Sequence, residues 1–150
     1  MKPHLLCTAL VWASLNMSAW SAAPICPEVA DIAPQMLSGR WQIDWRDEDR
    51  SHTQAPWVIE LGPHPEYAGS LKGTLRHGPQ HHAVVADWDD DSLTMEESED
   101  GVHIAATWQA SLSPGQCGRE LQGVRFTGSE PDASARRFKM RRDDVWPSRP

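Results

Sequence analysis

Hydrophobic and polar residues alternate through most of residues 37–142, in short runs that are separated by Gly, Pro, Asp and Ser clusters. An apolar residue at every second position predicts a strand with one buried face, because successive side chains point to opposite sides of a sheet. Trp41, Ile43 and Trp45 follow this pattern early in the chain. We count about eight runs of strand length, the spacing typical of an antiparallel barrel or sandwich.

The clearest alternation lies in residues 102–109, where Val102, Ile104, Ala106 and Trp108 fall on one face. We therefore expect one continuous strand there, with these four side chains in the core. The turn before it contains Asp100-Gly101, a pair that suits tight turns because glycine readily adopts a positive φ.

Connections of only a few residues favour a meander, which can close so that no strand edge stays exposed. The sequence thus predicts an all-β fold, an eight-stranded antiparallel up-and-down barrel, with a β-sandwich as the alternative. Residues 27–35 predict a turn or two of helix ahead of the barrel. The predicted domain spans residues 24–142, and residues 143–150, with two prolines, predict a flexible tail.

Residues 1–23 have the features of a secretory signal peptide. Lys2 precedes an apolar stretch, and Ser21-Ala22-Ala23 offers the small residues of a cleavage site. The stretch is short for a membrane span, although an uncleaved anchor is the alternative. We expect a periplasmic or secreted protein without a membrane span in its mature chain.

Two cysteines, Cys26 and Cys117, follow the predicted cleavage site. An exported chain with one such pair most simply joins them in a disulfide, and two separate buried thiols are the alternative. The formal net charge is −7, which disfavours nucleic acid as a partner because that needs a basic surface.

Gly39-Arg40-Trp41 at the start of the first predicted strand resembles the calycins, the superfamily that includes lipocalins and small bacterial metalloprotease inhibitors. Calycins share a Gly-x-Trp on the first strand and an Arg or Lys near the last strand that packs over the Trp. The resemblance implies a calycin-like barrel in which Arg142, or else Arg141, covers Trp41. Gly39, Trp41 and Arg142 would then close the barrel, since cation–π attraction favours a guanidinium on an indole face.

Trp88 lies beside the acidic turn Asp89-Asp90-Asp91, and we expect its indole to be exposed. An exposed Trp can anchor a protein partner, so Trp88, Asp89, Asp90 and Asp91 are candidate partner-binding residues. A Trp partly covered at the barrel rim is the alternative.

His77, His81 and His82 flank the turn Gly78-Pro79-Gln80, so a hairpin there could bring imidazoles together as copper or zinc ligands. Polar cover at a turn is the alternative for these histidines.

No residue set indicates a reaction: Asp87, Glu96 and Glu97 lack a fixed separation, and no serine lies in a nucleophile elbow. We predict a non-enzymatic binding protein without a cofactor, most simply a module for a protein partner, with inhibition of a secreted enzyme as one such role. A carrier of a small apolar ligand and a periplasmic metal-binding protein are the alternatives. The carrier ranks lower because large Trp, Leu and Ile side chains dominate the inward positions and leave little room in an eight-stranded barrel.

Overall fold

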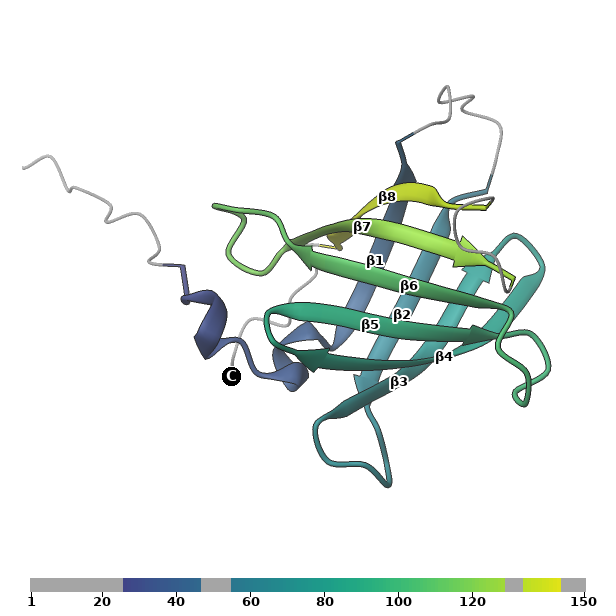
Figure 1. Cartoon of the computed structure of the whole chain (residues 1–150), viewed down its shortest axis with the longest axis horizontal. Helices are drawn as coiled ribbons and strands as arrows, with labels where there is room; N and C mark the ends of the chain where they lie inside the picture. Colours follow the sequence, from purple (N-terminus) through teal and green to yellow (C-terminus); the bar gives the residue numbers. More distant parts are fainter. Residues whose placement is uncertain (1–25, 47–54, 129–133, 144–150) are drawn as a thin grey trace, which may run out of the picture.

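The strands of the protein form a closed antiparallel barrel. A computed structural model describes residues 26–46, 55–128 and 134–143, and the predicted signal peptide and most of the predicted tail lie outside them. Each strand pairs with the next, and the last pairs with the first, which confirms the predicted up-and-down barrel (Figure 1). The strands are β1 (Gly39–Trp45), β2 (Trp57–Pro63), β3 (Ser70–His77), β4 (Gln80–Asp89), β5 (Ser92–Ser98), β6 (Ala106–Leu112), β7 (Glu120–Thr127) and β8 (Arg136–Arg142).

Alternation decides which side chains face inward. Trp41 and Ile43 on β1, Leu71 and Leu75 on β3, and Phe138 on β8 are each at most 4% exposed, while the residues between them face outward or lie partly covered. Burial of such large apolar side chains contributes roughly 1.5–3 kcal/mol each to folding. The barrel interior is thus the hydrophobic core.

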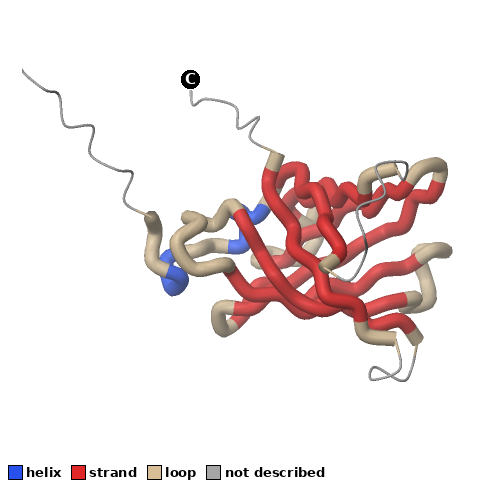
Figure 2. Tube along the Cα trace, turned by 90° about the horizontal axis from the view of Figure 1, so that it is seen from above, coloured by secondary structure: helices blue, strands red, loops and turns tan. Residues whose placement is uncertain are grey.

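Two short 3-10 helices precede β1, where the sequence predicts a helical turn. They are η1 (Val29–Asp31) and η2 (Pro34–Leu37), and Pro34 is the first residue of η2, where its missing N–H is tolerated. Both lie at one end of the barrel, which we name the near end (Figure 2). Leu37 is buried, and its carbonyl accepts a 2.9 Å hydrogen bond from Trp41 Nε1.

A disulfide joins Cys26 to Cys117, as predicted from the cysteine count. Cys117 belongs to the β6–β7 connection at the near end, so the bridge ties the segment before η1 to the barrel. The opposite end, which we name the far end, holds the β3–β4 turn and the β5–β6 connection.

The predicted strand 102–109 is wrong in its first half. β6 begins at Ala106, and residues 99–105 form an irregular connection. Val102 is 79% exposed and Ile104 is 56% exposed, although their spacing matches the buried Ala106 and Trp108. Local hydrogen bonding in residues 99–105 explains the difference.

Candidate functional site

Polar and aromatic side chains replace aliphatic ones on the inner face of the barrel at the far end. Near-end and central inward positions carry residues such as Leu71, Leu93 and Leu121, which are at most 2% exposed. Toward the far end, the inward register positions carry Trp45, Trp57, His77, His82, Glu97, Trp108, Arg125 and Arg136.

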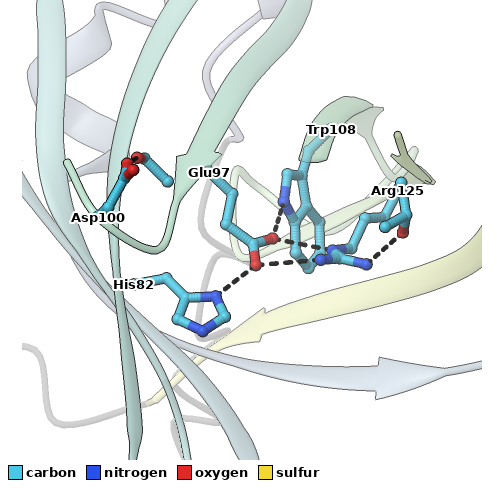
Figure 3. Close-up of polar contacts among 7 residues, drawn as sticks. His82, Glu97, Asp100, Trp108 and Arg125 are labelled. Carbon is cyan, nitrogen blue, oxygen red and sulfur yellow. Dashed lines mark hydrogen bonds and ion pairs between the residues drawn. The ribbon is translucent and has the colours of Figure 1, made fainter. Parts of the chain in front are cut away.

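Glu97 is the centre of this group and is fully buried. Its carboxylate lies between His82 and Arg125, with the Trp108 indole beside it (Figure 3). Arg125 Nε donates to Oε2 at 2.9 Å and Nη2 donates to Oε1 at 3.0 Å, while Trp108 Nε1 donates to Oε2 at 2.9 Å. His82 Nδ1 lies 2.6 Å from Oε1 and must carry the hydrogen, because a carboxylate only accepts.

This hydrogen bonding keeps Glu97 ionised inside the barrel. Burial alone raises the pKa of a carboxyl group, but the bonds from Arg125, His82 and Trp108 together lower the pKa of Glu97 below its usual value. Four donors on one carboxylate satisfy its acceptor capacity, and Arg125 uses its remaining edge to bond Thr127 Oγ1 at 2.7 Å. The charge and the hydrogen-bonding capacity of Glu97 are therefore satisfied by its neighbours, an arrangement that does not favour proton transfer.

Aromatic rings surround this ion pair. The Arg125 guanidinium lies 5.3 Å from the Trp108 ring and 6.0 Å from the Trp57 ring, within cation–π range. Trp45 packs against Trp57 and Trp108 with ring centroids 5.3 and 5.6 Å apart, and the Arg136 guanidinium lies 4.0 Å from the Trp45 ring. Side chains thus fill the inner face at the far end.

The β5–β6 connection starts two residues after Glu97 and is held together by Asp100. Asp100 Oδ1 accepts 2.8 Å hydrogen bonds from the backbone N–H groups of Val102 and His103, and Oδ2 lies 2.7 Å from His103 Nδ1. The bond with His103 and these backbone bonds lower the pKa of Asp100 well below its usual range. Gly101 has φ +77°, which allows the chain to turn.

The same bonds explain why Val102 and Ile104 leave the barrel. Because the Asp100 carboxylate takes the N–H groups of Val102 and His103, these groups cannot join a strand ladder. Pairing resumes at Ala105, whose N–H donates to the Glu97 carbonyl at 2.8 Å. We name residues 99–105 the far-end loop; it presents two aliphatic side chains to solvent on a backbone with its own hydrogen bonds.

The predicted partner-binding residues lie at the near end, in the β4–β5 turn, away from the far-end loop. Asp89, Asp90 and Asp91 are exposed, and the latter two have positive φ values of 45° and 64°. The expected exposure of Trp88 is wrong: it occupies an inward position of β4, is half-buried and packs against the core. Partner binding by this turn stays a prediction.

The three candidate metal-ligating histidines do not share a face. His77 stacks on Trp57 with ring centroids 4.4 Å apart, and His82 bonds Glu97, so both occupy inward positions. His81 is exposed, because neighbouring strand residues point to opposite sides. Over the described ranges, no group of three or more His, Cys, Asp or Glu side chains could hold a metal ion.

Gly39, Trp41 and Arg142 meet where β1 pairs with β8 at the near end. The Arg142 guanidinium lies 5.2 Å from the Trp41 ring and also donates to the Met36 and Ser38 carbonyls. Gly39 has φ +138°, and a Cβ there would lie 3.2 Å from Arg142 Nε. The arrangement therefore requires glycine at this position.

Arg125 has no predicted role, and Glu97 is predicted neither as a buried residue nor as a member of an ion pair. A signal was present, since Glu97 is in phase with Leu93 and Met95, and Arg125 is in phase with Leu121. Opposite charges at inward positions of two strands indicate a buried pair, because a lone charge in the core is costly.

Comparisons with protein-family models, curated proteins and solved structures find no match. The closed eight-stranded barrel is compatible with a calycin-like fold. Within the described ranges, no helix has the length and apolar character that crossing a membrane requires.

Proposed function

We propose that this protein is an exported, non-enzymatic binding module that recognises a protein partner through the far-end loop. The observation that carries the proposal is the exposure of Val102 and Ile104 on a loop that Asp100 holds in place. Apolar side chains in a preorganised loop favour binding, because less conformational entropy is lost when the complex forms.

The filled interior also favours a surface site over an internal one. Trp41, Trp108 and Phe138 are each at most 1% exposed. The Glu97–Arg125 pair beside Trp108 is fully hydrogen-bonded. An apolar cargo would have to displace these side chains. A carrier of a small apolar ligand therefore remains the weaker proposal, and native mass spectrometry of the purified protein would reveal a retained lipid.

A projecting loop is complementary to a concave surface, and the cleft of a secreted enzyme is such a surface. Val102 and Ile104 would enter an apolar part of the cleft, and the enzyme would be inhibited by steric occlusion. Export is inferred from the predicted signal peptide, and the Cys26–Cys117 disulfide suits an oxidising compartment.

The test uses the mature protein immobilised as bait in extracts of the periplasm and culture medium. The matched baits are a Val102→Asp/Ile104→Asp variant and Tyr67→Ser, which removes an exposed ring at the opposite end of the barrel. A partner that binds the wild type and Tyr67→Ser, but not the loop variant, supports the proposal. The captured protein is then purified and its affinity for each variant is measured.

Two results would count against the far-end loop as the contact element. One is a purified partner that binds the loop variant as tightly as the wild type. The other is loss of binding in both variants, which would indicate a contact surface elsewhere. Equal thermal unfolding temperatures of the three baits serve as the control for folding.

A further inference from the structure

The outer face of β7 and β8 carries a hollow that is separate from the far-end loop. The cavity measures about 530 Å³ and opens to solvent. Its lining includes Arg46, Gln122, Gly123, Val124, Arg137 and Phe138. The volume falls within the range of about 300–1,000 Å³ that is typical of small-molecule sites.

Strand alternation places four of the lining residues, Arg46, Gln122, Val124 and Arg137, outside the barrel, whereas Gly123 and Phe138 occupy inward positions. Gln122 and Val124 alternate on β7 with the inward Leu121 and Arg125, and Arg137 precedes the inward Phe138 on β8. Arg46 follows β1 directly, and its N–H donates to the Arg137 carbonyl at 3.0 Å. The two arginines therefore start from adjacent backbone positions on neighbouring strands.

Arg46 and Arg137 are both exposed, and neither makes an ion pair within the described part of the chain. The next outward cations on β8 differ from them. Lys139 Nζ lies 2.7 Å from Glu120 Oε1, and Arg141 Nε lies 3.0 Å from Glu120 Oε2. Among the described residues, the positive charge at the hollow thus has no acidic partner, whereas the positive charge further along β8 is paired with Glu120.

We propose that this hollow binds a small organic anion in which a carboxylate is attached to an apolar body. Guanidinium groups bind carboxylates through two parallel hydrogen bonds, and two of them at one site favour a fully ionised ligand. Val124 supplies an apolar wall, and the Gln122 amide can donate to or accept from a polar substituent. This site is independent of the partner surface proposed above.

Isothermal titration calorimetry of the mature protein tests the proposal with three probes. These are 2-naphthoate, its neutral amide 2-naphthamide, and inorganic phosphate. We expect 2-naphthoate to bind one site per chain, more tightly than either of the other two. Binding should weaken as salt is added, because the guanidinium groups are exposed to solvent.

Arg46→Gln and Arg137→Gln should each weaken 2-naphthoate binding roughly tenfold, since each removes a charged hydrogen-bonding group. The matched control is Arg119→Gln, an exposed arginine in the β6–β7 connection at the near end, which should leave the affinity unchanged. Val124→Asp should abolish binding by placing a negative charge in the hollow.

The sequence after Arg46 reads Asp47-Glu48-Asp49, which lies outside the described residues. A variant with Asn, Gln and Asn at these positions shows whether they compete with the probe. Unchanged or tighter 2-naphthoate binding in this variant agrees with a site made by Arg46 and Arg137.

The proposal is overturned if the amide binds as tightly as the acid, if phosphate binds as tightly as 2-naphthoate, or if the double variant Arg46→Gln/Arg137→Gln keeps wild-type affinity. Absence of 2-naphthoate binding to the wild type also overturns it. None of these results bears on the far-end loop, whose variants leave the hollow intact.

Discussion

Arg125 and Glu97 form a bidentate ion pair inside the barrel, which joins β7 to β5 across the intervening β6. The Nε–Oε2 and Nη2–Oε1 distances are 2.9 and 3.0 Å, and the Arg125 side chain is only 11% exposed. Since β6 pairs with both strands, this contact bridges two ladders at once. It also holds β5 in place two residues before the far-end loop begins.

Replacing Glu97 with Gln should destabilise the protein by about 3–5 kcal/mol, because it leaves the Arg125 charge buried without its counter-ion. Arg125→Met should lower stability by a similar amount, since it leaves the buried Glu97 carboxylate without its counter-ion. The double variant should lose less than the sum of the two. Urea unfolding of all four proteins checks this, and strict additivity would show that the two charges do not interact.

The stability of the protein should fall as the pH is lowered through the acidic range. The pKa of Glu97 is below its usual value of 4.5 in the folded state, and the pKa of Glu120 is lowered to about 2 by Lys139 and Arg141 despite partial burial. A carboxyl group with a depressed folded pKa stabilises the fold above its unfolded pKa, and this stabilisation is lost as the pH falls toward the folded value.

We therefore expect stability to be independent of these groups above about pH 5.5 and to decline below about pH 4.5. Glu97→Gln should show a shallower decline than the wild type, although its stability is lower throughout. Unfolding free energies measured from pH 7 to pH 3 provide the test. Parallel curves for the two proteins would assign the acid sensitivity to other groups.

Asp100→Ala should loosen the far-end loop without unfolding the barrel. The N–H groups of Val102 and His103 lose their acceptor, so their hydrogen exchange should accelerate, while exchange at Trp108 in β6 stays slow. Asp90→Ala, in the exposed β4–β5 turn, is the matched control and should leave the loop unchanged. Slow exchange at Val102 in Asp100→Ala would mean that other contacts hold the loop.

Gly39→Ala should destabilise the barrel by about 1–3 kcal/mol, because the backbone of an alanine is strained at φ +138° and its Cβ would lie too close to the Arg142 side chain. Arg142→Gln should cost a similar amount, through loss of the cation–π contact with Trp41 and of the bonds to the Met36 and Ser38 carbonyls. Arg40→Ala, an exposed neighbour, serves as the comparison. Thermal unfolding ranks the three, and equal loss in all would contradict a specific role for Gly39.

Replacing Cys26 and Cys117 with Ser should lower stability by about 4–5 kcal/mol, since the bridge spans 91 positions and restricts the unfolded chain. The refolded double variant should keep the barrel, because η2 and Trp41 contact each other independently of the bridge. Far-ultraviolet circular dichroism and urea unfolding separate these two expectations. A fully unfolded variant would show that the disulfide is required for the barrel itself.

The sequence alone determined the periodicity, and with it an eight-stranded barrel or else a sandwich, the near-end helical turn and most inward positions such as Trp41, Leu75 and Phe138. These features follow from local alternation and turn residues, which are visible along the chain. The Cys26–Cys117 pair was also predictable, since the two cysteines that follow the predicted cleavage site have few alternatives in the oxidising compartment that a signal peptide implies.

Only the tertiary structure decided the chemistry at the far end. Val102 and Ile104 continue the alternation of Ala106 and Trp108, yet Asp100 captures the loop backbone and turns them toward solvent. The Glu97–Arg125 pair and the hollow beside Arg46 and Arg137 depend on which strands become neighbours when the barrel closes. Periodicity fixes the face on which a side chain lies, whereas its partners are fixed by residues far away in the sequence.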